Sequence, residues 1–170
     1  MRTRAIVRFL RSRRGTTALE FALAAVPFVL LLIGILELAW QCATAAALDA
    51  AVLRASRFGI TGQATLAGEP PQYTCRSDTI KWVISNSTGG FLKPENLVVA
   101  TEAYGSASAL SGGTPVAGAG TGGQVVIYGV TYTQPFLTGS AWINFVGGSG
   151  SQTHRATVVV KNEPFANATC

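Results

Sequence analysis

The stretch that decides the fold is residues 13–41, which read RRGTTALEFALAAVPFVLLLIGILELAWQ. The stretch opens on basic residues, Gly15 follows them, and no charged residue occurs from Phe21 to Leu36. At a rise of about 1.5 Å per residue, a helix over residues 16–40 would be roughly 37 Å long, which exceeds a hydrocarbon core of about 30 Å. The stretch therefore predicts one membrane-spanning helix, residues 16–40, behind a basic leader, residues 1–15.

The junction of leader and helix reads Arg14-Gly15-Thr16-Thr17-Ala18-Leu19-Glu20-Phe21. It resembles the prepilin-peptidase site of type IV pilin-like proteins, in which the cut follows the glycine and a glutamate stands fifth in the mature chain beside an aromatic residue. The amino-acid sequence of this junction is similar to that of the TadE-like minor pseudopilins of the tight-adherence (Tad, or Flp) pilus. The stretches 130–136 and 159–164 fit that family in outline. The resemblance implies processing at Gly15 and Thr16, and assembly through Glu20 and Phe21.

The basic residues are unevenly distributed. Six of the thirteen lie in the leader, where no acidic residue occurs, so the remaining seven basic and eight acidic residues leave a net charge of −1 after Gly15. The mature chain thus has no basic patch of the kind that nucleic acid requires, and we expect no nucleic-acid partner. Leader arginines favour a cytoplasmic N-terminus and a periplasmic C-terminal part at the inner membrane. The resemblance implies as partners a prepilin peptidase, other Tad pilins or pseudopilins, the assembly platform and membrane lipid.

Glu20 has two compatible interpretations. With Thr17 as the N-cap, it completes a capping box at the start of the helix, where the helix dipole favours a carboxylate. A charge just inside the bilayer is also unfavourable by about 2.5–3.5 kcal/mol on insertion scales, so it usually has a partner. Cleavage after Gly15 would create that partner, the amine of Thr16, on the same chain or on a neighbouring subunit.

The helix is expected to continue beyond the membrane to residue 58. Residues 43–57 are rich in alanine and leucine and contain no Gly or Pro, and Gly59 is suited to a C-cap. Four alanines spaced by four residues form one smooth stripe: Ala43, Ala47, Ala51 and Ala55. The stripe allows close approach either of the protein's own sheet or of a neighbouring subunit.

Residues 59–170 predict a small α+β globular part. The pattern indicates a linker over 59–74, a short helix over 79–85 capped by Ser77 or Asp78, and strands over 97–104, 124–133 and 152–161. Seven of the nineteen residues in 105–123 are glycines, which predicts a flexible loop with little core. The segment 142–146 is apolar, and its pattern assigns it neither to a helix nor to a strand. The expected fold is a long N-terminal helix whose outer half lies on an antiparallel sheet, as in type IV pilins and pseudopilins.

The three cysteines are Cys42, Cys75 and Cys170, and His154 is the single histidine. The absence of any Cys-x-x-Cys pair argues against a metal site. In an oxidising compartment Cys75 and Cys170 could form a disulfide; the alternative is three free thiols. His154 is expected at the surface or at a sheet edge. No nucleophile–base pattern supports catalysis, so we expect no enzyme and no cofactor.

Three functions compete on the sequence alone. The first is a structural or assembly-priming minor pilin of a Tad pilus, cut after Gly15. The second is an uncleaved, single-pass, membrane-anchored periplasmic binding module. The third is a secreted protein released after Ala45, since Ala43-Thr44-Ala45 is a small-x-small site.

Overall fold

The computed structural model describes residues 16–63, 66–139, 148 and 150–166. Its contacts divide the chain into two compact units, Met1–Ala39 and Trp40–Cys170. The leader and the apolar segment 142–146 lie outside the described residues. The boundary between the units falls within the long helix α2, so the two parts of that helix have different surroundings.

Helix α2 runs from Thr16 to Ile60, two residues beyond the expected end. Among the described residues it is the one helix long and apolar enough to cross a membrane, with a mean hydropathy of 2.5 over its most apolar stretch. In the first unit its large apolar side chains are exposed; Phe21, for instance, is 75% exposed. An exposed apolar surface all round a helix suits lipid and does not suit water.

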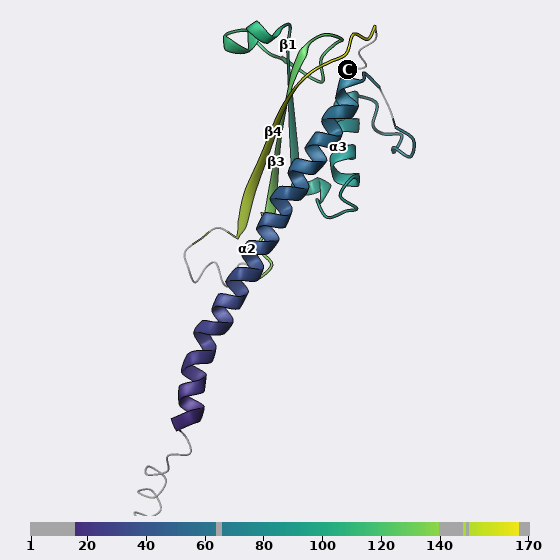
Figure 1. Ribbon diagram of the computed structural model, residues 1–170. Helices are drawn as coiled ribbons and strands as arrows, with labels where there is room; N and C mark the ends of the chain where they lie inside the picture. The colour runs from purple at the N-terminus through teal and green to yellow at the C-terminus, as the bar shows by residue number, and fades with distance from the viewer. Residues whose placement is uncertain (1–15, 64–65, 140–147, 149, 167–170) are drawn as a thin grey trace, which may run out of the picture. The chain divides into compact units, whose positions relative to one another are not determined.

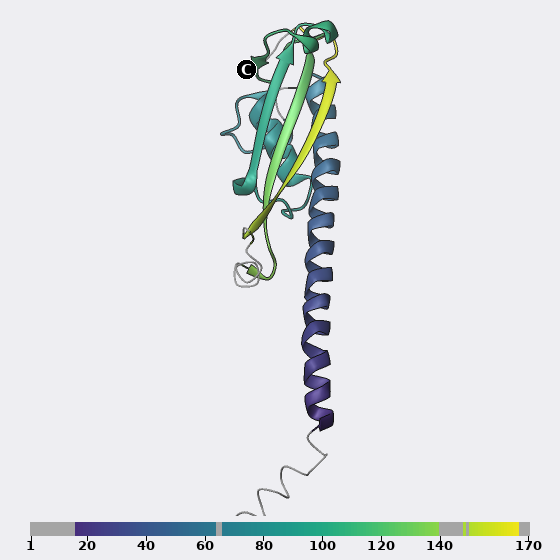
Figure 2. The same cartoon turned by 90° about the vertical axis from the view of Figure 1, so that its left-hand side faces the viewer.

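The second unit contains an antiparallel sheet with the strand order β2-β1-β3-β4. Its strands are β1 (Leu97–Tyr104), β2 (Val116–Ala117), β3 (Val125–Pro135) and β4 (Ser151–Lys161). Strands β1, β3 and β4 lie side by side in Figure 2, and β3 pairs along its whole length with β4. The three long strands occur where the sequence predicted them, which confirms the α+β fold.

One face of the sheet forms the core. Four alternate side chains of β3 are at most 2% exposed, as expected for one face of a strand: Val126, Tyr128, Val130 and Tyr132. On β4, Ala156 is buried, whereas Arg155 and other residues on the opposite face are exposed. The other face therefore stays open.

Two helices cover the core face (Figure 1). In the second unit, α2 buries residues spaced by three or four, among them Leu48, Ala51, Val52, Ala55 and Phe58. Ala51 and Ala55 of the predicted stripe lie in this core, whereas Ala43 is exposed. The stripe therefore packs on the protein's own sheet over its C-terminal half.

The second covering helix, α3, spans Arg76–Asn86 and buries Ile80 and Ile84 completely. The prediction that Ser77 or Asp78 caps this helix was wrong. The N-cap position is taken by Cys75, which makes no side-chain capping bond; its carbonyl accepts from the amides of Asp78 and Thr79. The helix starts earlier because the side chain of Arg76 is drawn into the interior, where it is 1% exposed.

Gly59 does not act as a C-cap, contrary to the prediction. It lies inside α2 and is buried, and Gly62, with φ of 70°, is the first glycine after the helix in the left-handed region. A Cβ on Gly59 would lie 2.1 Å from the Tyr128 hydroxyl oxygen. The glycine is therefore required by close packing against β3.

The glycine-rich segment 105–123 has more structure than predicted. It contains a 3-10 helix at Ala107–Ser111 and strand β2, which pairs with Glu102 and Ala103 of β1. Ala119 is fully buried in the core. Glycine supplies the tight turns here, and the segment is fixed by contacts with distant parts of the chain.

Candidate functional site

The residues expected to act in processing and assembly lie at the start of α2. Gly15 is outside the described residues, and Thr16 is the first residue of the helix. Glu20 and Phe21 follow one turn later and are both exposed. No described residue hydrogen-bonds or ion-pairs with the Glu20 carboxylate. The structure thus presents a carboxylate and an aromatic ring at consecutive, exposed positions of the apolar helix.

The capping box expected at this end is not the geometry found. Helix α2 already includes Thr16, so Thr17 is a helical residue and not the N-cap. A capping box requires its Ser or Thr at the non-helical position before the first turn. Glu20 therefore keeps its carboxylate free of the capping role assigned to it.

At the first residues of the second unit, α2 is fixed by two contacts. The ring of Trp40 meets that of Phe91 edge-on, with 4.8 Å between the centroids. The Nε2–H of His154 donates to Oε1 of Gln41 over 2.8 Å. His154 is half-buried on edge strand β4, and Gln41 is buried. The sequence gives no local signal of the Gln41–His154 contact, because the two residues are 113 positions apart.

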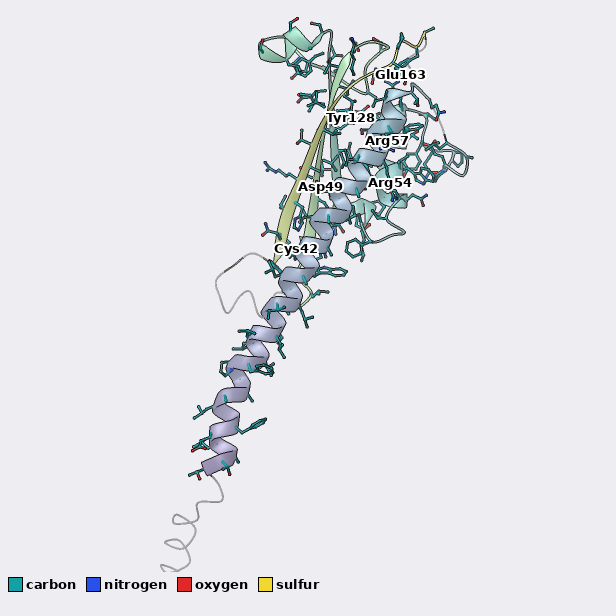
Figure 3. All side chains as sticks on the ribbon, in the orientation of Figure 1. Cys42, Asp49, Arg54, Arg57, Tyr128 and Glu163 are labelled. Carbon is teal, nitrogen blue, oxygen red and sulfur yellow. The ribbon has the colours of Figure 1, made fainter. Side chains whose placement is uncertain are left out.

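The charged residues on the rest of α2 face solvent. Asp49, Arg54 and Arg57 are all exposed and are labelled along the helix in Figure 3. Arg54 also donates from Nη1 to the carbonyl of Ser87 over 3.3 Å. These three charged side chains lie off the buried face of the helix.

Arg76 is the buried charge that the sequence did not reveal. Its Nη2 donates to the carbonyls of Ala119 and Gly120, and its guanidinium carbon lies 4.8 Å from the centre of the Phe165 ring. Burial lowers the pKa of Arg76, against a smaller opposing effect of the nearby Tyr128. Burial likewise raises the pKa of the Tyr128 hydroxyl. Arg76 is recognised as a buried charge only from its surroundings in the structure, because an arginine near the start of a helix usually faces water.

The cysteines differ in state. Cys75 is disulfide-bonded, whereas Cys42 is a free, exposed cysteine. Cys170 lies outside the described residues, so the pairing of Cys75 with Cys170 stays a prediction.

Shallow grooves on the described surface include two that lie on different elements. One, of about 390 Å³, lies between α2 and the end of α3 and includes Arg54 and Phe91. The other, of about 590 Å³, follows β1 from Val99 to Glu102 and includes Ser77. Neither brings a nucleophile together with a base, and no group of three or more His, Cys, Asp or Glu among the described residues could hold a metal ion.

Among the described residues, one apolar helix is long enough to cross a membrane, and a small α+β unit follows it. Comparison with family models is more specific: the model described as TadE-like protein matches residues 15–57. This match confirms the resemblance noted at residues 14–21, and it shows that the N-terminal part of the chain is similar to TadE-like proteins. The TadE-like family is a structural pilus component. Curated proteins and solved structures gave no match.

Proposed function

We propose that the protein is a minor pilin or pseudopilin of a Tad pilus, a structural or assembly-priming subunit. A prepilin peptidase cuts it after Gly15, and Thr16 becomes the new N-terminus. Residues 16–40 anchor the subunit in the inner membrane, with residues 59–170 in the periplasm, and the helix joins other Tad pilins at the assembly platform.

The observation that carries the proposal is the position of the TadE-like match. It begins at Gly15, includes Glu20 and continues through the part of α2 that packs on the sheet. The match therefore covers the proposed cut, the proposed assembly residue and the helix that joins the membrane to the globular unit. A peptidase-cut pilin requires these three parts in this order.

The folded core argues against release after Ala45. That cut would remove Trp40, Gln41 and Thr44 from the second unit. Thr44 is completely buried, and its hydroxyl donates to the carbonyl of Trp40 over 3.0 Å. An uncleaved binding module would keep Trp40, Gln41 and Thr44, as the proposed pilin does. These residues therefore do not distinguish the two functions, and an experiment is needed to do so.

The function is tested by replacing Glu20. A nearby cation would stabilise the ionised carboxylate of Glu20 just inside the bilayer, and the amine created at Thr16 would be that cation. Glu20→Gln keeps the size and the hydrogen-bonding groups of the side chain and removes its charge. We expect the variant to be cleaved and inserted normally but to fail to support pilus production, and to lose copurification of other Tad components.

Asp49→Asn is the matched control, since Asp49 is an exposed acid further along the same helix. It should assemble as the unaltered protein does. Pilus production by Glu20→Gln at the level of this control would remove the electrostatic role of Glu20. Normal pili in a strain that lacks the protein altogether would remove the proposed function itself.

A further inference from the structure

Strand β4 runs in the same direction as the part of α2 that belongs to the second unit, and the two are joined at both ends. At one end His154 is hydrogen-bonded to Gln41 over 2.8 Å. At the other end the amide of Glu163 donates to the carbonyl of Ile60 over 3.0 Å. The helix rises roughly 28 Å between its two contacts, and an extended chain covers up to roughly 30 Å between its own. The level at which α2 enters the second unit is therefore also the level of His154.

The hairpin of β3 and β4 continues beyond this level. Strand β4 begins three residues before His154, and its first residue, Ser151, pairs with Pro135 of β3. At about 3.3 Å per residue, the paired strands extend past His154 by up to about 10 Å. The described residues beyond this level, 133–139 and 150–153, form the hairpin tip. In Figure 2 this tip lies below the rest of the sheet, on the side from which α2 enters the second unit.

The hairpin tip is uncharged and partly apolar. The sequence has no charged residue from 133 to 153. The side chain of Leu137 is 58% exposed, and that of Phe136 is half-buried. On β4 the first charged residue beyond the tip is Arg155, which is exposed. This pattern suits the boundary between acyl chains and headgroups, because a long cationic side chain can reach the phosphates while apolar groups lie deeper.

The position of the membrane surface follows from the proposed span, residues 16–40, on which this inference rests. A span that ends at Trp40 places the surface near Gln41, since tryptophan is favoured at that interface. A tip that extends up to about 10 Å further reaches the depth of about 5–10 Å at which interfacial segments lie. Unpaired backbone groups of a turn are unfavourable in hydrocarbon, so the tip stays at the boundary and does not enter the bilayer core.

We propose that the hairpin tip is a lipid-binding surface. It lies at the boundary of headgroups and acyl chains in the leaflet next to the globular unit, with Leu137 among the acyl chains and Arg155 at the phosphates. Because the tip itself is uncharged, the contact does not require anionic lipid. It holds the globular unit at the membrane surface while the subunit is in the bilayer, and a subunit that leaves the bilayer for a pilus has to release it.

The test is the fluorescence of a label on the purified protein in phosphatidylcholine nanodiscs, with and without bromine on the acyl chains. The label is attached at the exposed tip position Gln152 through Gln152→Cys in a Cys42→Ser background, and the Cys42→Ser protein alone sets the background of labelling. Brominated lipid should remove more than about half of the fluorescence at this position. The same label at Ser108→Cys, in the 3-10 helix beyond the opposite end of the sheet, should lose less than about a tenth.

Leu137→Asp should reduce the quenching of the Gln152 label at least about two-fold, because a carboxylate does not stay among acyl chains. The matched control is Leu110→Asp, since Leu110 is an exposed leucine of the 3-10 helix Ala107–Ser111. It should leave the quenching unchanged. Thermal unfolding followed by circular dichroism checks that both variants fold, and Leu137→Ser replaces Leu137→Asp if the latter does not.

A label at Leu31→Cys, which is 59% exposed in the first unit, separates this inference from the proposed membrane span. Quenching at Leu31 without quenching at Gln152 would overturn the lipid contact of the tip and leave the proposed function in place. Absence of quenching at Leu31 would contradict the span, and the lipid contact with it. Undiminished quenching at Gln152 in the folded Leu137 variant would also overturn the proposal, because Leu137 would then have no part in the contact.

Discussion

The contact between Gly59 and Tyr128 shows how one residue sets the approach of helix and sheet. The position that a Cβ on Gly59 would occupy is 2.1 Å from the Tyr128 hydroxyl oxygen and 2.9 Å from the ring carbon that bears it. The hydroxyl is buried and has no hydrogen-bond partner among the described residues. The tyrosine ring is thus accommodated by the absence of a side chain on α2, a long-range requirement that the local sequence around Gly59 cannot show.

Gly59→Ala should destabilise the protein by about 1–3 kcal/mol, since added atoms in a packed core force their neighbours to move. Tyr128→Phe should change stability by less than about 1 kcal/mol, because the hydroxyl that it removes is unpaired. In the Tyr128→Phe background, the cost of Gly59→Ala should fall by at least about 0.5 kcal/mol. Denaturant unfolding of the full-length protein in micelles measures all three values.

The matched control for this series is Gly105→Ala, because nothing lies within 4 Å of a Cβ at Gly105. Its stability should equal that of the unaltered protein. Additive effects of Gly59→Ala and Tyr128→Phe would show that the two residues do not constrain each other.

At the scale of elements, α2 has two different surroundings along one continuous helix. Its residues up to Ala39 expose large apolar side chains, whereas its residues from Trp40 onward bury one face in the core. Small side chains at Ala51 and Ala55 allow the helix to lie close to the sheet. Along α2, a larger side chain should therefore destabilise the globular unit on the buried face and should have little effect on the exposed faces.

Ala55→Leu should destabilise the protein by about 1–3 kcal/mol, because the site is 1% exposed and has no space for three more carbons. Ala46→Leu, at an exposed position of the same helix, should have an effect within about 0.5 kcal/mol. Thermal unfolding followed by circular dichroism compares the two variants. Equal stability of both would mean that the helix does not pack on the sheet through this face.

The elements whose pattern is local were predicted closely, and those fixed by distant contacts were not. Alternation of apolar residues placed the three long strands, and the uncharged run placed α2. The start of α3 was misplaced because burial of Arg76 depends on Ala119, more than forty residues away. The glycines of 105–123 predicted a flexible loop. The pairing of β2 with β1 and the burial of Ala119 depend on distant residues, so the local composition does not indicate them.

At the scale of the whole molecule, the processing and assembly site stays a prediction, and it rests on a short, continuous motif of the pilin type. Gly15, Thr16, Glu20 and Phe21 were all selected from eight adjacent residues, and the family match begins at the first of them. The contacts that organise the globular unit join distant segments, as with Gln41 and His154. A single sequence carries no record of such pairs, so they became visible only in the folded structure.

The six leader arginines predict that the globular unit lies outside the cytoplasm. A cysteine at the exposed position Ser108, introduced as Ser108→Cys in a Cys42→Ser background, should react with a membrane-impermeant maleimide once the outer membrane is permeabilised. The cytoplasmic membrane need not be opened. Labelling that requires lysis of the inner membrane would show the opposite orientation.

The central claim is that the chain is processed as a pilin, and the N-terminal sequence of the protein isolated from membranes of its native cells tests it most directly. The account predicts Thr16 as the first residue of the unaltered protein. It predicts Met1 as the first residue of Gly15→Val, in which a bulky side chain occupies the last position before the cut. Gly34→Ala is the control for insertion, because nothing lies within 4 Å of a Cβ there, and it should also begin at Thr16. Retention of Met1 in the unaltered protein, or a start at Ala46, would contradict the account.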